Sequence, residues 1–388
     1  MHLWDISQYI NIVSFDVPFP ANYGGVIDVY YKLFQLKQQG VKIHLHCFKY
    51  GRAESQELNK LCEKVYYYPR NTSFLNQLSF LPYTVKSRIN NKLKQNLLSN
   101  NYPILFEVLH TCYLLKDPQF RTRFKIYRHS NIEHDYYNEL AKAESNLLKK
   151  VYFKLEAYKL KKFERIINYA QLVLAVNKKD TDYFKANYPQ CNVHYLPSFH
   201  PHNTFKSFCE IKPQMLFHGN LSVSENYNAA LWFLHEVAPQ CELPLIIAGL
   251  NPPEKLINKV KQTPNSQIIA NPSEKELATL IQQSCINLLF TQQATGLKLK
   301  LLNVLFNSKF IICNQNMLEG TDIIATGGLF IANTNQEFIN CIEELKNKTF
   351  GQEEILERSK QIAQFSNQSN IELLMRLCFN EIAGNKLA

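Results

Sequence analysis

The sequence predicts an α/β protein with two doubly wound domains, each built on a parallel β-sheet. Three observations support this fold class. The chain has 388 residues, which is more than a single hydrophobic core usually organises. Apolar residues make up 46% of it, with 25 Phe and 21 Tyr, so a folded protein is expected and a disordered one is not. Short apolar runs also alternate with longer amphipathic ones, which is typical of parallel strands joined by helices.

The first half of the chain contains six apolar runs of strand length. They are Ile10–Phe15, Lys42–Cys47, Lys64–Tyr68, Ile104–Glu107, Phe124–Tyr127 and Leu172–Val176. A helix is predicted between the first two, from about Gly25 to Gln39. Gly40 follows this helix directly and is a suitable residue to end it.

The second half repeats the same alternation. Its predicted strands are Gln214–His218, Leu245–Ala248, Gln267–Ala270, Ile286–Phe290, Phe310–Cys313 and Leu329–Ala332. The stretch from Ser198 to Pro213 lacks periodicity and carries two prolines, so we interpret it as the linker. We therefore expect domains at residues 1–200 and 201–365, with a helix at 366–388 that packs back on the first domain. Ligands of such folds bind in the cleft at the carboxyl ends of the strands.

Charge and cysteine content narrow the choice of partners and compartment. The net charge is +10 with a pI near 8.9, which favours nucleotide phosphates, anionic lipid headgroups or nucleic acid as partners. Nucleic acid is disfavoured, because the chain has no aromatic RNA-binding motif, zinc-finger spacing or Gly/Arg tract. The ten cysteines form no Cys-x-x-Cys pair, so neither disulfides nor zinc are expected and the cytoplasm is the predicted location.

A membrane-spanning segment is not expected, but contact with a membrane surface is left open. Residues 1–10 lack a basic region followed by an apolar one, and no apolar run approaches the roughly 18 residues that cross a bilayer. A long Lys-rich helix is predicted over residues 141–165. Its lysines form a solvated face or a face that docks on a partner or on the inner surface of a membrane.

The segment from Cys285 to Asn303 has the features of an anion site. A predicted buried strand leads into a polar loop, then Gly296, then a helix, and the first amides of a helix attract negative charge. Lys300, Asn303 and Asn307 lie at i, i+3 and i+7, so they share one side of that helix. They would hold a phosphate and a ribose, or they form an ordinary solvated helix face.

Two glycine-containing turns follow predicted strands and offer backbone amides to a ligand. Gly24 and Gly25 open the first helix, where a phosphate or sugar could approach the backbone, although an ordinary turn also uses such a pair. His218, Gly219 and Asn220 end the first strand of the second domain, where the alternative is a plain loop. Neither turn is the G-x-G-x-x-G fingerprint, so a NAD-dependent oxidoreductase is disfavoured.

The segment from Arg128 to Tyr137 is dense in polar and ionisable residues at the end of a strand. This density favours a functional cluster over a surface cap at the start of a helix. Two other patterns are better explained by structure. Asp180 and Asp182 resemble a metal-binding Asp-x-Asp pair but start a helix, and His44 and His46 alternate along a buried strand without further metal ligands.

Together these segments resemble the GT-B glycosyltransferases, in particular the retaining family-4 group (glycosyl transferases group 1) of bacterial polysaccharide transferases. No single motif carries the resemblance, but the order and spacing of the motifs do. The matching segments are Pro18 to Gly25, Arg128 to Tyr137 (similar to Arg-x-His-Asn-x-Glu-His-x-Tyr-Tyr), Leu172 to Asp180, Phe217 to Phe233, Gly296 to Leu305 (similar to Gly-Thr-Arg-x-Lys-x-x-Glu-Ala) and Glu319–Gly320.

The resemblance implies two Rossmann-like domains that face each other across a cleft, with a UDP- or GDP-sugar in the second domain. It implies a saccharide or lipid-linked acceptor in the first domain, and transfer with retention that needs no metal or cofactor. Lys300 and Lys298 would stabilise the departing diphosphate, with Asn131 and Glu133 as further catalytic residues. The implied donor-binding residues are His218, Gly219, Asn220, Gly296, Asn303, Glu319 and Gly320, and the implied acceptor or phosphate contacts are Gly24, Gly25, Arg128 and His129.

Two departures from the family pattern qualify this expectation. The usual pair of glutamates, eight residues apart, falls on Thr295 and Asn303, neither of which is charged. The histidine that usually precedes Asn131 is replaced by Ser130, and His129 lies one position earlier. The chain is therefore expected to be a divergent transferase of surface polysaccharide synthesis. The alternative is a catalytically weakened binding or scaffold protein with the same fold.

Overall fold

The computed structural model describes residues 8–144, 146–205, 210–292 and 296–380. Contacts divide the chain into two units, and we describe each unit by itself. The first comprises residues up to Pro201 together with residues 295–297 and 367–388, and the second comprises residues 202–294 and 298–366.

The first unit is built on a parallel sheet in the order β3-β2-β1-β4-β5-β6-β7. Its strands are β1 (Tyr9–Ser14), β2 (Lys42–Lys49), β3 (Lys64–Pro69), β4 (Ile104–Glu107), β5 (Lys125–Arg128), β6 (Leu172–Ala175) and β7 (Asn192–Tyr195). The chain adds β2 and β3 on one side of β1 and then returns to add β4 on the other. This reversal of strand order is where doubly wound folds place their ligands.

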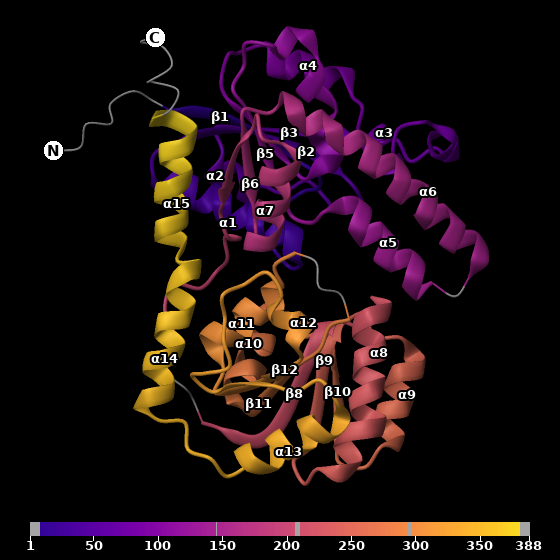
Figure 1. Cartoon of the computed structure of the whole chain (residues 1–388), viewed down its shortest axis with the longest axis vertical. Helices are drawn as coiled ribbons and strands as arrows, with labels where there is room; N and C mark the ends of the chain where they lie inside the picture. Colours follow the sequence, from indigo (N-terminus) through magenta and orange to yellow (C-terminus); the bar gives the residue numbers. More distant parts are fainter. Residues whose placement is uncertain (1–7, 145, 206–209, 293–295, 381–388) are drawn as a thin grey trace, which may run out of the picture. The chain divides into compact units, whose positions relative to one another are not determined.

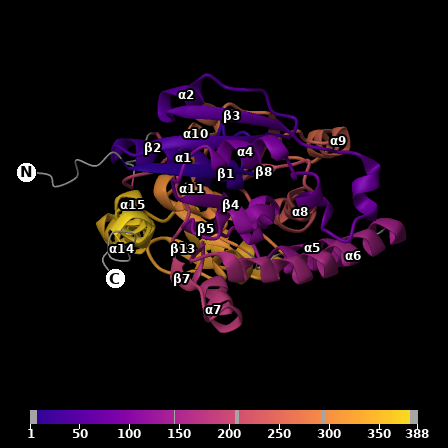
Figure 2. The same cartoon turned by 90° about the horizontal axis from the view of Figure 1, so that it is seen from above.

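Helices cover both faces of this sheet. One core contains residues of α1 (Gly24–Gln38), α2 (Glu57–Leu61) and α15 (Asn367–Met375). The opposite core contains residues of α4 (Asn91–Leu98), α6 (Leu147–Glu164), α7 (Lys178–Asn187) and the short segment η2 (Leu109–Lys116). The segments η1 (Phe74–Leu78) and α3 (Tyr83–Lys86) lie between β3 and α4 in sequence. Helix α5 (Glu133–Ala143) runs beside α6 (Figure 1, Figure 2).

The second unit repeats this layering on a parallel sheet in the order β10-β9-β8-β11-β12-β13. Its strands are β8 (Lys212–Asn220), β9 (Leu245–Leu250), β10 (Ser266–Ala270), β11 (Ser284–Leu289), β12 (Phe310–Cys313) and β13 (Leu329–Ile331). Its α-helices are α8 (Ser224–Trp232), α9 (Glu254–Gln262), α10 (Glu274–Gln283), α11 (Leu299–Asn307), α12 (Gln315–Leu318), α13 (Asn335–Leu345) and α14 (Gln352–Ile362). The chain adds β9 and β10 on one side of β8 and then returns to add β11, β12 and β13 on the other, so the strand order reverses at β8.

Local sequence explains where several helices begin and end. Gly40 ends α1 with a φ of 79°, and its amide bonds back to Lys37 O, because glycine tolerates this conformation. Ser273 and Glu276 form a reciprocal capping box at α10. Thr334 and Glu337 do the same at α13, which satisfies amides that lack helical partners.

The predicted strands agree with the structure to within a few residues, and one strand was missed. Strand β7 was not predicted, because of its four residues only Val193 is buried. The predicted single helix over 141–165 is wrong. Helix α5 ends at Ala143, and α6 begins at Leu147 after a cap in which the Asn146 side chain accepts from Lys149 N. The expected linker is shorter than predicted, because its last residues, Lys212 and Pro213, already belong to β8.

Candidate functional site

The loops that follow β8, β11 and β12 form the candidate donor site, because these three strands are neighbours in a parallel sheet. These loops and the adjoining ends of strands and helices comprise, among the described residues, 218–226, 290–292, 296–300 and 314–320. Most of the described residues expected to bind the donor therefore come from one edge of one sheet. The polar contacts between the loops after β8 and β11 define the geometry of this edge.

Lys300, in the first turn of α11, lies at the centre of these contacts. Its Nζ donates to Asn226 Oδ1 at 3.1 Å and to the Phe290 carbonyl at 3.2 Å. The side chain is half-buried. Burial lowers the pKa of Lys300 to about 8, while the nearby Glu225 carboxylate acts in the opposite direction. The structure thus holds an amine whose charge an anionic ligand would stabilise.

Glu225 ties the loop after β11 to the start of α8. Its carboxylate accepts from the Thr291 hydroxyl and from the Gln292 amide, the latter at 2.9 Å. Asn314 holds the same loop from β12, accepting from Thr291 N at 3.2 Å and donating to Thr291 O at 2.7 Å. Sequence reasoning singled out neither Glu225 nor Asn314 as a site residue. The only signal was that each stands just after a predicted strand or at the start of a helix.

The His218–Gly219–Asn220 turn is closely packed against α8. A side chain at Gly219 would come within 3.0 Å of Asn226 Cγ, so glycine lets Asn226 approach and donate to Asn220 O at 3.0 Å. His218 is buried, and its Nε2 has no hydrogen-bond partner among the residues that the structure describes. Burial and the neighbouring Lys300 charge lower the pKa of His218 to about 4, so the imidazole is neutral at physiological pH.

Asn303 and Asn307 differ from the expected solvated face of α11. Asn307 is buried, and its Nδ2 donates to Asn303 O at 2.7 Å and lies 3.2 Å from His202 Nδ1. Asn303 is half-buried and accepts from the same amide at 3.1 Å. Lys300 instead reaches α8. The three residues predicted to share one polar side of α11 therefore make separate contacts: Lys300 bonds to Asn226 on α8, and Asn303 bonds to Asn307.

The remaining predicted donor residues lie in the same loops. Lys298 is the half-buried N-cap residue of α11, and Gly296 adopts a φ of 65° just before it. Glu319 and Gly320 follow α12, and Gly320 has a φ of 77°. Such positive φ values suit glycine. Thr295, the first of the two positions expected to hold a glutamate, lies outside the described residues.

In the first unit, Gly24 and Gly25 form the start of α1, as the sequence predicts. A side chain at Gly25 would come within 2.6 Å of the Phe15 ring, so glycine is needed for the close approach of this turn. The N-cap residue Tyr23 makes no side-chain cap. Its hydroxyl instead donates to Asp16 at 2.9 Å. The N-cap residue of α1 therefore supplies no side-chain oxygen to the first amides of the helix.

Arg128 does not fit the expected role of a ligand contact, because the structure places it in the interior. Its side chain is 1% exposed and forms an ion pair with Asp28 at 3.1 Å. The guanidinium also donates to the carbonyls of Leu196 and Pro197. Burial alone would raise the pKa of Asp28, but Arg128 and Lys32 outweigh it and lower it to about 2. Arg128 thus anchors the chain that leaves β7.

Of the other residues of the Arg128–Tyr137 segment, four are buried, four are half-buried and Asp135 is exposed. His129 lies 3.5 Å from Asp180 Oδ2, and burial together with the Arg128 charge lowers its pKa to about 3. Glu133, in the first turn of α5, lies 3.2 Å from His110 Nε2, a neighbour that the sequence did not indicate. Asn131, which lies between His129 and Glu133 in sequence, is half-buried.

The structural explanations for the two other patterns are confirmed. Asp180 accepts from Asn177 Nδ2 at 2.7 Å, and its amide donates to Asn177 Oδ1, as expected of a helix start. His46 is buried between Tyr68 and Asn11. Across the described residues, no group of three or more His, Cys, Asp and Glu side chains could hold a metal ion. The nine cysteines that the structure describes form no disulfide.

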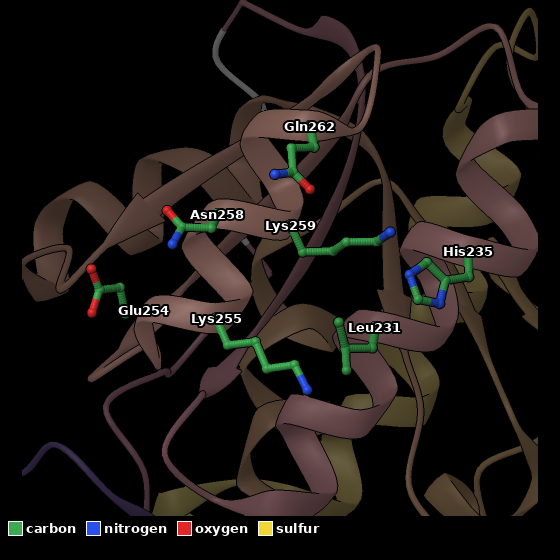
Figure 3. Close-up of a pocket in the computed structure, with 7 residues that line it drawn as sticks. All are labelled: Leu231, His235, Glu254, Lys255, Asn258, Lys259 and Gln262. Carbon is green, nitrogen blue, oxygen red and sulfur yellow. The ribbon is translucent and has the colours of Figure 1, made fainter.

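A surface hollow of about 640 Å³ lies elsewhere in the second unit, between α8 and α9 (Figure 3). Its walls are Leu231, His235, Glu254, Lys255, Asn258, Lys259 and Gln262. None of these residues belongs to the loops after β8, β11 and β12. The hollow is therefore separate from the residues expected to bind the donor.

No protein-family model matches the chain. Over 366 residues, the chain is 28% identical to a Klebsiella pneumoniae protein described as an uncharacterized 44.6 kDa protein in a cps region. The match covers 89% of this chain and 93% of that protein.

Several solved glycosyltransferase structures share the architecture. Anabaena HepE in complex with UDP and glucose matches with a TM-score of 0.65 and 11% identity, covering 95% of this chain and 99% of that one. A mutant of S. aureus TarM in complex with Fondaparinux, alpha-GlcNAc-glycerol and UDP matches with a TM-score of 0.65 and 9% identity, covering 96% and 100%. A trehalose-phosphate synthase of Burkholderia vietnamiensis has a TM-score of 0.56 and 9% identity, covering 94% and 97%.

These comparisons identify the fold. The two parallel sheets of seven and six strands, covered by helices, form the α/β architecture of the GT-B class. The fold class predicted from the sequence is thereby confirmed. In the part of the chain that the structure describes, no helix is both long enough and apolar enough to cross a membrane.

Proposed function

We propose that the chain is a glycosyltransferase that transfers a hexosyl group, with retention, from a UDP- or GDP-sugar to a saccharide or lipid-linked saccharide. The observation that carries this proposal is Lys300, held by Asn226 and the Phe290 carbonyl at the sheet edge where the loops after β8, β11 and β12 gather. In a GT-B fold, this edge is the ligand-binding side of a doubly wound unit.

The chemistry that Lys300 supplies is electrostatic. When the sugar leaves, negative charge develops on the nucleotide diphosphate, and a fixed ammonium group stabilises that charge more than it stabilises the intact donor. A lysine can do so without a metal. Lys298 and the loop amides near Gly296 would add further positive potential at the start of α11. Retention of the configuration at the transferred sugar and the identity of the nucleotide base are both parts of this proposal.

The comparisons support the donor and the setting. HepE has been solved with UDP-glucose as well as with UDP and glucose, and TarM has been solved with UDP, so related folds accept this class of ligand. The Klebsiella relative is described by its place in a cps region, which fits a role in polysaccharide synthesis. We accordingly propose a saccharide acceptor bound by the first unit.

A second candidate function is a weakened GT-B protein that acts as a scaffold in polysaccharide assembly. The observation that favours it is Asn303, an uncharged residue whose side-chain oxygen already accepts from Asn307. Asn303 would give a ribose a weaker contact than the usual glutamate. Both candidates share a nucleotide site, so turnover and not binding distinguishes them.

The first prediction is that UDP or GDP binds in the presence of EDTA. Lys300, and not a metal ion, would neutralise the diphosphate, so removal of divalent cations should leave the dissociation constant within about twofold. Isothermal titration calorimetry measures it directly, after a thermal-shift screen of UDP, GDP, ADP and their sugars has selected the base. Binding that disappears with EDTA would contradict the metal-independent site.

The second prediction concerns pH. Because burial lowers the pKa of Lys300 to about 8, about half of the free protein carries a neutral amine at pH 8. A bound diphosphate favours the charged form, so binding at this pH should take up about half a proton, and affinity should fall as pH rises further. Near pH 6 the uptake should approach zero. Titrations with a UDP-sugar in buffers of different ionisation enthalpy measure the uptake, which Lys300→Met should abolish.

A further inference from the structure

The first unit exposes apolar side chains in and just after η1. Phe74, Leu75 and Leu78 are about seven-tenths exposed, and Phe80 is fully exposed. Single exposed apolar residues are common on soluble proteins, but four within seven positions are not. This segment therefore presents an apolar surface that its own unit does not cover.

Helix α6 exposes a second set of apolar side chains on its outer face. Its inner face is buried through Glu156, Ala157, Leu160 and Glu164. Five apolar residues lie outside, each more than half exposed: Leu147, Leu148, Val151, Leu155 and Tyr158. At 3.6 residues per turn these five fall within an arc of about 100°. The outer side of the helix is thus mostly apolar, and Lys162 joins the same arc near its C-terminal end.

The two sets of apolar residues lie on neighbouring elements, because polar contacts join α6 to η1 and to α3, the helix that follows η1. Lys159 Nζ donates to the Gln77 carbonyl at 3.0 Å. The Glu156 carboxylate accepts from the Tyr83 amide at 2.7 Å. We name the exposed apolar residues of these two elements the η1–α6 surface.

The exposed charges that η1 and α6 themselves carry are all of one sign. Helix α6 carries four exposed lysines: Lys149, Lys154, Lys161 and Lys162. Its only acidic residues, Glu156 and Glu164, are both buried on the inner face. Residues 70–86, which include η1, contain no Asp or Glu at all. An apolar strip on a helix whose exposed charges are all basic is complementary to a surface that is apolar inside and anionic outside.

We propose that the η1–α6 surface binds an anionic lipid bilayer, with α6 lying in the plane of the headgroups. The apolar side chains would enter the boundary between headgroups and acyl chains, while the lysines pair with lipid phosphates. A second copy of the chain fits less well, because facing surfaces would bring the lysines of α6 together and repel. This proposal does not depend on the nucleotide site, which lies in the other unit.

Co-sedimentation of the full-length protein with sucrose-loaded vesicles tests the proposal. Vesicles of phosphatidylcholine with a third phosphatidylglycerol should bind the protein about tenfold or more tightly than phosphatidylcholine alone. The double variant Lys154→Glu/Lys161→Glu should lose this preference for anionic vesicles. The double variant Phe80→Ser/Leu155→Gln should weaken binding to both kinds of vesicle by about tenfold.

Matched controls separate this surface from general effects of charge and hydropathy. Leu356 on α14 is 57% exposed, close to the 55% of Leu155, so Leu356→Gln makes the same change in a helix elsewhere. Lys275, exposed on α10, provides the control Lys275→Glu. Both controls should bind vesicles like the unchanged protein. All the replaced side chains are exposed, so thermal unfolding should stay the same in every variant.

Two results would overturn the proposal. One is binding that is absent, or that the η1–α6 variants change no more than the controls do. The other is a concentration-dependent dimer in sedimentation velocity that Phe80→Ser/Leu155→Gln abolishes, which would assign the surface to a second copy of the chain. Nucleotide titrations without vesicles, run on the same variants, show whether the donor site is intact, so failure of one proposal is distinguishable from failure of the other.

Discussion

Replacement of Lys300 by methionine should lower turnover by about a hundredfold or more, which is the usual effect of removing one electrostatic contact to a transition state. Methionine keeps most of the aliphatic stem but removes the ammonium group that donates to Asn226 and the Phe290 carbonyl. Because charge develops on the diphosphate as the sugar departs, the rate should fall more than the affinity for the intact donor. Slow hydrolysis of a UDP- or GDP-sugar measures this rate without knowledge of the acceptor.

Two controls make the result specific to the position of the charge. Lys275→Met removes a lysine exposed on α10 of the same unit and should leave hydrolysis unchanged. Lys300→Arg keeps a positive charge but changes its geometry, so its rate should lie between those of the unchanged protein and Lys300→Met. If the unchanged protein releases no more nucleotide than Lys300→Met does, the scaffold function is favoured over the transferase.

The strands were predictable because their signal is local. A parallel strand covered on both faces reads as a continuous apolar run, as in Leu245–Ala248. Strand β7 lies at the edge of its sheet, next to β6 only, and its exposed Asn192 and half-buried His194 break the run. The break between α5 and α6 was missed for a related reason. Lysine and apolar residues continue through it at helical spacing, and only the Asn146 cap marks the restart.

The candidate site was predictable in its parts but not in its contacts. Glycine turns after strands, and a lysine in the first turn of a helix, are visible as short motifs. The contact between Glu225 and Thr291 joins residues 66 positions apart, and the pair of Arg128 with Asp28 joins residues 100 positions apart. The sequence places such residues at the correct ends of strands. It does not show which side chains turn inward, because burial of a charge depends on a partner from elsewhere in the chain.

Loss of Arg128 should cost about 3–5 kcal/mol of stability, because it leaves Asp28 buried without its main partner. The Asp28 carboxylate accepts from the Arg128 guanidinium, from Lys32 Nζ at 3.1 Å and from the Phe199 amide at 2.7 Å. Lys32 also pairs with the buried Glu107 at 2.6 Å. The four side chains together are neutral, and Arg128→Met leaves one negative charge in excess. Urea unfolding measures the loss, and Arg121→Met, at an exposed position, is the matched control.

A double variant distinguishes this structural role from the ligand contact that the sequence suggested. Asp28→Asn/Arg128→Met removes one charge of each sign and leaves the Lys32–Glu107 pair neutral. It should therefore be less destabilised than the sum of the two single variants. A contact with an acceptor or phosphate would behave differently. The free energy of unfolding of Arg128→Met would then lie within about 0.5 kcal/mol of that of the unchanged protein. The substitution would instead raise the KM for the acceptor, and this effect would not depend on Asp28.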